Sequence, residues 1–114
     1  MITRIKNCRP YTVNSNGSID DRLMTDEPLD VKHEVLKWIT ENIHPRKTPN
    51  LKHTSYGLKH IFQRDTKIYL TNNEFKDAMM ICGYYPTNEH KLNWTYCISQ
   101  KSPAFKRKSN GYDC

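Results

Sequence analysis

Residues 55–86 read SYGLKHIFQRDTKIYLTNNEFKDAMMICGYYP, and this stretch decides the fold. Its best-specified element is a helix over residues 72–82. Thr71 and Glu74 form a T-x-x-E capping box, in which a hydroxyl and a carboxylate each satisfy a backbone N–H at the helix start. Gly83 follows as a C-terminal stop. Apolar residues recur at i, i+3, i+4 and i+7, which predicts a buried stripe of Phe75, Ala78, Met79 and Cys82.

A second, shorter helix is predicted over residues 55–64. Ser55 is a suitable N-cap, because its hydroxyl can accept a hydrogen bond from an N–H of the first turn. Gly57 is unfavourable inside a helix, so we expect it to mark the close approach of another backbone. Residues 67–70, KIYL, are short and β-prone and predict a strand or an extended linker. The buried edge of the helix is Leu58, Ile61 and Phe62.

Two further elements flank this stretch. Apolar side chains at helical spacing predict a first helix over residues 29–43, and Pro45 stops it. Residues 92–98, LNWTYCI, place alternate side chains on opposite faces, which predicts a half-buried strand. A hairpin between this strand and residues 83–86 is compatible with the turn-rich connection that joins them.

These elements predict an α+β fold, three helices with a short antiparallel sheet, which is winged-helix-like. We expect a partly ordered N-terminal arm over residues 1–28, a single α+β domain over residues 29–100, and a basic flexible tail over residues 101–114. In a winged helix the third helix enters the major groove by its N-terminal end. The alternative is a small α+β domain whose third helix is an ordinary one, with asparagines that serve only as caps.

The positive charge is concentrated in two segments. The 114 residues carry a net charge of +6, of which residues 44–53 contribute +3 and residues 101–108 contribute +4, so the remainder carries −1. Both segments contain proline and lack apolar periodicity, which predicts a loop and a tail that are free to reach a polyanion. The alternative is that the charge only keeps the protein soluble. The candidate binding residues are Arg46, Lys47, Lys52, Lys59, Asn72, Asn73, Lys76, Lys106, Arg107 and Lys108.

The sequence predicts a cytoplasmic protein with no cofactor. No apolar run approaches the roughly 20 residues of a membrane helix, and the N-terminus has no apolar stretch of signal-peptide length. The cysteines are widely spaced, so we expect free thiols and small buried side chains rather than a disulfide framework. A structural zinc site remains an alternative, although close ligand pairs are missing. The cysteines are Cys8, Cys82, Cys97 and Cys114, and the candidate histidines are His53, His60 and His90.

No catalytic motif is present, and we expect a protein without enzymatic activity. The chain lacks G-x-S-x-G, H-E-x-x-H, P-loop and G-x-G-x-x-G patterns. A nuclease site would need carboxylates that converge with a lysine, and a nucleophilic dyad of His60 and Cys82 would need a shared cleft. The carboxylates and the lysine available for the first are Asp65, Glu74, Asp77 and Lys67.

Several short patterns carry a resemblance to other proteins. They are S-Y-x-L-K-H, Y-x-x-N, F-K-x-A-M, G-Y-x-P and N-W, spread over about residues 35–103. Together they resemble a module in small phage and mobile-element proteins of Gram-positive bacteria, a module with no established activity. The winged-helix end domain of some phage primases is a weaker likeness.

The resemblance implies a phage or prophage origin and hence a binding protein that acts in the host. The first expectation is an anti-CRISPR-type inhibitor of a host nucleic-acid-targeting effector of the Cas9 class. A basic inhibitor is suited to guide RNA, target DNA or an acidic face of its target. The alternative is a winged-helix DNA-binding transcriptional regulator, or a phage accessory protein, whose partner is duplex DNA.

Overall fold

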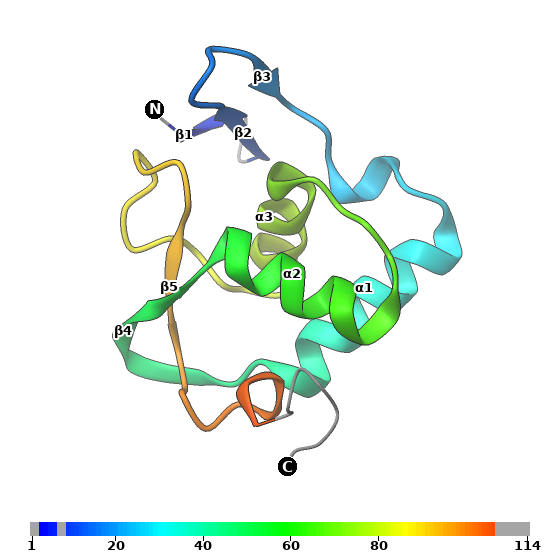
Figure 1. Cartoon of the computed structure of the whole chain (residues 1–114), viewed down its shortest axis with the longest axis vertical. Helices are drawn as coiled ribbons and strands as arrows, with labels where there is room; N and C mark the ends of the chain where they lie inside the picture. The colour runs from blue at the N-terminus through cyan, green and yellow to red at the C-terminus, as the bar shows by residue number, and fades with distance from the viewer. Residues whose placement is uncertain (1–2, 7–8, 107–114) are drawn as a thin grey trace.

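The computed structural model describes residues 3–6 and 9–106 and has the predicted α+β fold with three helices (Figure 1). Its strands form two antiparallel sheets, one of β1, β2 and β3 and one of β4 and β5. In chain order the elements are β1 (Thr3–Lys6), β2 (Arg9–Val13), β3 (Ile19–Asp20), the 3-10 turn η1 (Met24–Asp26), α1 (Leu29–Asn42), β4 (Pro45–Thr54), α2 (Ser55–Thr66), α3 (Asn72–Ile81), β5 (Thr95–Ile98) and the 3-10 turn η2 (Pro103–Phe105).

The part from α1 to β5 follows the order of a winged helix. One strand, β4, lies between the first two helices, and it pairs with β5, which follows the third helix. The predicted capping box is present, since Thr71 Oγ1 accepts from Glu74 N and Glu74 Oε1 accepts from Thr71 N. Residues 67–71 form an irregular linker rather than a strand. In place of the predicted hairpin between residues 83–86 and 92–98, Thr87 contacts Thr95 through an N–H···O bond of 2.9 Å and through their hydroxyls at 2.7 Å.

The core joins one aromatic side chain from each helix. Trp38 of α1 meets Phe62 of α2 edge-on, with ring centroids 5.5 Å apart, and Phe75 of α3 lies 6.3–6.4 Å from both. Such edge-to-face pairs add to the stabilisation that burial of the rings already gives. The indole N–H of Trp38 donates to the Asp65 carboxylate at 2.9 Å. Trp94, just before β5, and Tyr96 of β5 extend the core and are fully buried, as the alternating pattern predicts.

Within the predicted N-terminal arm, the described residues 9–26 contact the rest of the fold. Figure 1 places β1 and β2 over the N-terminal end of α3. Arg9 of β2 donates two hydrogen bonds to the carboxylate of Asp77 in α3, at 2.8 and 2.7 Å. Asp77 is 1% exposed and also accepts from the backbone N–H of Met24 at 3.0 Å. These contacts tie β2 and η1 to α3.

The first basic segment is a strand rather than the predicted loop. Pro45 pairs with Ile98, Asn50 with Tyr96 and Thr54 with Thr95, and the register shifts between each of these pairs. Strand β4 has ten residues, whereas its partner β5 has four. Extra residues in one strand of a pair form bulges. The residues in a bulge are unpaired, and the bulged strand bends. The bulged stretches, residues 46–49 and 51–53, contain all the cations of β4.

Candidate nucleic-acid interface

The N-terminal half of α3 is buried, so it cannot act as the predicted recognition helix. Asn73 and Lys76 are both 0% exposed. The Asn73 amide donates to the carbonyls of Pro10 and Arg22, both at 2.9 Å, and its oxygen accepts from the Thr12 hydroxyl at 2.9 Å. Every hydrogen-bonding atom of this side chain is used inside the protein. Asn73 therefore anchors β2 to α3. It has a structural role, and the prediction that it binds a partner is wrong.

The prediction that Lys76 contacts a partner is also wrong. Its ammonium donates to the Thr12 hydroxyl at 2.9 Å and lies 4.7 Å from the centroid of the Trp94 ring. Burial lowers the pKa of Lys76 to about 7, although the nearby Asp20 carboxylate opposes this shift. Because the side chain is enclosed by β2 and by a core tryptophan, it contacts neither base nor phosphate in the folded protein.

Asn72 is half-buried and links three segments. Its oxygen accepts from the Ser55 hydroxyl at 2.9 Å, and its amide donates to the side-chain oxygen of Asn93 at 3.0 Å. Ser55 is therefore not the cap of α2; the Thr54 side chain caps this helix by accepting from Gly57 N. Asn72 holds the start of α3 to α2 and to the loop before β5. These contacts favour the ordinary-helix alternative for α3.

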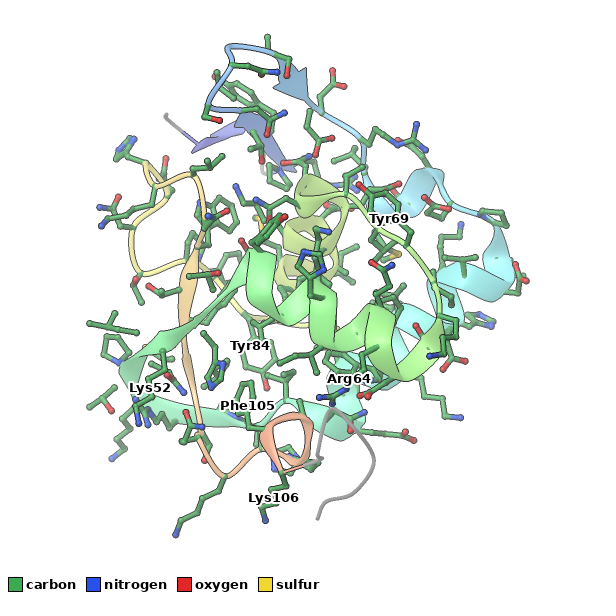
Figure 2. The ribbon with its side chains drawn as sticks, viewed as in Figure 1. Lys52, Arg64, Tyr69, Tyr84, Phe105 and Lys106 are labelled. Carbon is green, nitrogen blue, oxygen red and sulfur yellow. The ribbon has the colours of Figure 1, made fainter. Side chains whose placement is uncertain are left out.

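The two basic segments lie together on one edge of the molecule. We use the name basic ribbon for their exposed cations, which are Arg46, Lys47, Lys52, Lys101 and Lys106. The backbone N–H of Ser99 donates to His44 O at 2.7 Å, and the rings of His53 and Phe105 stack with centroids 3.7 Å apart. Figure 2 shows Lys52, Phe105 and Lys106 toward this edge. Pairing of β4 with β5 thus joins segments that lie about fifty residues apart in the chain.

The charge of the basic ribbon is not neutralised by neighbouring acids. Residues 44–53 and 99–106 contain no Asp or Glu. None of the five cations has an ion pair among the described residues. The Arg46 guanidinium donates to two carbonyls of its own bulge, those of Thr48 and Pro49, at 2.9 and 2.7 Å. Burial lowers the pKa of His53, so this stacked imidazole favours its neutral form.

The described part of the tail is packed against the body as far as η2. Ser102 and Ala104 are buried, and the Ser102 hydroxyl accepts from His44 N at 2.9 Å. Lys106 is exposed directly after this anchored turn. The remaining candidates of the tail, Arg107 and Lys108, lie outside the described residues.

Lys59 lies in α2 and has no contact with the basic ribbon among the described interactions. Its side chain is only 5% exposed, and its ammonium lies 5.0 and 4.9 Å from the ring centroids of Tyr56 and Tyr69. Burial lowers its pKa. The sequence singles out Lys59 through its charge, but only the structure shows that two tyrosines flank it. No pattern in the sequence marked Tyr69 as a candidate binding residue; it was part of the predicted strand or linker only.

The candidate metal ligands and acids are dispersed. Among residues 3–6 and 9–106, no three His, Cys, Asp or Glu side chains gather as a metal site. Cys82 and Cys97 are free and half-buried, and burial raises the pKa of the Cys82 thiol. Cys8 and Cys114 lie outside the described residues. Asp77 pairs with Arg9, whereas Asp65 bonds Trp38 and Arg64.

Comparisons of the chain with protein-family models, with curated proteins and with solved structures found no match. In the described part of the chain, no helix has both the length and the apolar character needed to cross a bilayer.

Proposed function

We propose that this protein binds nucleic acid without catalysis and that the basic ribbon contacts the phosphate backbone. The observation that carries the proposal is the gathering of five exposed, unneutralised cations on one edge, from two segments that are distant in the chain. Binding of such cations to phosphates releases condensed counterions, which favours association at low salt. Pairing with β5 holds the residues that flank the bulges, and the anchored η2 turn comes directly before Lys106.

The proposed contact is with the backbone and not with base edges. The side chains suited to bidentate base recognition, Asn72 and Asn73, are occupied inside the fold. The basic ribbon offers Arg46, Lys47 and Lys52 from the bulges of β4, and two lysines from the segment after β5, and such cations suit phosphate oxygens. We therefore expect binding with little sequence preference, and this expectation sets the proposal apart from a sequence-reading regulator.

Inhibition of a Cas9-class effector is the second candidate function, and it rests on the resemblance to phage proteins. In that role the same basic ribbon would engage guide RNA or target DNA held by the effector. The two functions share one surface and differ in whether an effector protein is needed for tight binding.

The deciding experiment measures binding to a random-sequence duplex of about two helical turns as salt is raised. The ribbon variant carries Lys47→Gln, Lys52→Gln and Lys101→Gln. The control variant carries Lys32→Gln, Lys37→Gln and Lys91→Gln, which removes the same charge elsewhere. If each ribbon lysine contacts one phosphate, the slope of log affinity against log salt falls by about 3 in the ribbon variant. The control variant should keep the slope of the unmodified protein.

Two outcomes contradict the proposal. One is the absence of duplex binding at low salt, which would leave a protein partner. The other is an equal loss in the two variants, which would mean that the net charge acts without a defined surface. A Cas9 cleavage assay with the same variants then tests the second function. Inhibition that survives in the ribbon variant would place the inhibitory surface elsewhere.

A further inference from the structure

A pocket of about 490 Å³ lies beside the first turns of α2, and no residue of the basic ribbon lines it. Its walls come from β3 and the residues after it, from the first turns of α2, and from the linker that joins α2 to α3. Its volume falls within the range of small-molecule sites in proteins. The Lys59 side chain forms part of the lining, together with both tyrosines that flank its ammonium.

The pocket has exposed apolar walls. Ile19, Tyr56 and Tyr69 are 64%, 49% and 63% exposed, and all three line the pocket. Most large apolar side chains of the described residues are instead buried in the core. Exposed tyrosine rings on two sides of a pocket offer faces on which a planar ligand can stack, and such stacking does not depend on base identity.

Lys59 places a positive charge among these walls. Among the described residues, its ammonium has no carboxylate and no hydrogen-bond acceptor as a partner; it has only the two ring faces. A buried charge without a paired anion is unfavourable for folding. An anionic group bound in the pocket would supply the missing partner, with a charge-assisted hydrogen bond from the ammonium.

The other charged groups at the pocket are already engaged or lie in solvent. Asp20 accepts from Asn73 N at 3.1 Å and from the Thr71 hydroxyl at 3.3 Å, so the start of α3 holds its carboxylate. Arg22 faces Glu74 at 3.5 Å, and Asp21 is exposed. The exposed Asp21 carboxylate disfavours a ligand with several negative charges and can accept a hydrogen bond from an amino group.

We propose that this pocket binds a single nucleotide, with its base against a tyrosine face and its phosphate on the Lys59 ammonium. One available cation between two flat rings fits a ligand that combines a planar ring with one phosphate. The site is independent of the proposed backbone contact, because it shares no residue with the basic ribbon. The nucleotide can be free in solution or part of a single strand, and the chemistry recognised is the same.

The test is calorimetric titration of the full chain with a nucleoside monophosphate, the matching nucleoside and a short single-stranded oligonucleotide. Binding of the monophosphate identifies a free nucleotide as the ligand, and binding of the oligonucleotide alone identifies a strand. Lys59→Met keeps the length of the side chain but removes its charge. It should weaken phosphate-dependent binding about tenfold or more and bring the affinity for the monophosphate down to that for the nucleoside.

Tyr69→Ala should weaken the monophosphate and the nucleoside alike, because it removes a stacking surface. The matched controls, Lys37→Met on α1 and Tyr85→Ala in the loop after α3, should change neither. Thermal unfolding of Lys59→Met checks the fold, and its Tm should equal or exceed that of the unmodified protein. The ribbon variant should keep the affinity of the unmodified protein for the nucleoside monophosphate. Failure of the pocket proposal can therefore be distinguished from failure of the proposed backbone contact.

Three results would overturn the nucleotide site. The first is no binding of any of the three probes. The second is binding that Lys59→Met leaves unchanged. The third is tighter binding of phenyl phosphate than of the nucleoside monophosphate, which would point to a phosphotyrosine peptide instead.

Discussion

The start of α3 and the basic ribbon look alike in the sequence and differ in the structure. Both carry amide or cationic side chains, and both were predicted to face a partner. Asn73 and Lys76 are completely buried, whereas Lys47 and Lys52 are exposed. The difference lies in what packs against each. The sheet of β1, β2 and β3 covers the start of α3, whereas among the described strands β4 pairs with the shorter β5 alone.

A polar helix face is therefore not evidence of a binding surface until the whole chain has been placed. Periodicity shows which side chains avoid water on one face, but it does not exclude a polar interface on the other face. In α3 that interface is complete, since the residues from Asn73 to Met80 are all buried. A strand that bulges out of its pairing offers few such partners, so its cations remain in solvent.

The largest expected effect is that of Arg9→Ala, which would loosen the sheet from α3. The substitution leaves the Asp77 carboxylate buried with only the Met24 N–H as a remaining partner. Removal of one member of a fully buried pair destabilises by about 3–5 kcal/mol, and we expect about 2–3 kcal/mol here because the Arg9 side chain is 37% exposed. Urea unfolding measures this loss. Arg46→Ala on the basic ribbon is the control and should change stability by no more than about 0.5 kcal/mol. Equal effects of the two changes would mean that Arg9 does not hold the sheet.

A pH-dependent effect in the opposite direction is expected for Lys76→Met. The pKa of Lys76 is about 7 in the folded protein, against 10.5 for an ordinary lysine. Between these values the unfolded chain binds the additional proton, so Lys76 makes the free energy of unfolding rise with pH by up to about 1.4 kcal/mol per unit. Below pH 7 both states are charged and the full penalty remains. The variant should therefore be more stable near pH 7, with an advantage that shrinks toward pH 10.

Urea unfolding at a series of pH values measures this difference. The exposed Lys52→Met of the basic ribbon serves as the control, because it removes a charge that is not buried. A constant difference between Lys76→Met and the unmodified protein at every pH would contradict the buried ammonium.

The smallest expected effect is that of Tyr96→Phe on β5. The Tyr96 hydroxyl is buried and has no hydrogen-bond partner among the described residues. Its removal should be neutral or stabilising by about 1 kcal/mol, because an unsatisfied buried polar group is unfavourable. Thermal unfolding measures the change. Asn73→Ala is the contrasting control, since it breaks three buried hydrogen bonds and should destabilise. A clear loss of stability in Tyr96→Phe would mean that the hydroxyl has a partner.

The sequence predicted the elements whose signals are local. The capping box of Thr71 and Glu74 and the alternation of Trp94, Tyr96 and Ile98 depend on neighbouring residues, and all are confirmed. The covering of α3 depends on partners about sixty residues away, such as Arg9 for Asp77. No local pattern in the β2 sequence RPYTV predicts that this strand packs against α3.

The expectation for Gly57 was wrong for a related reason. A Cβ at this position would meet only the Thr54 hydroxyl oxygen, at 3.8 Å, which is an ordinary contact. No backbone approaches the glycine closely among the described residues. A helix propensity shows that a residue is unfavourable, but it does not show which neighbour, if any, requires it.

The candidate site was predicted in part. The charge count identified Arg46, Lys47 and Lys52 and the basic tail as possible binding residues, and the structure leaves the described ones exposed. Their assembly into one edge depends on the pairing of β4 with β5 and on the stacking of His53 with Phe105. These long-range contacts are invisible to a count of charges along the chain.

The composition of β4 also bears on aggregation. A two-stranded sheet has free edges, and an exposed edge can pair with a strand from another copy of the chain. Pro45 and Pro49 have no N–H to donate to such a strand, and the bulges interrupt any straight ladder. Lys47 and Lys52 would bring like charges together across the new pairing. The exposed Leu51 therefore sits in a strand that resists edge-to-edge association, which should keep the protein dispersed at high concentration.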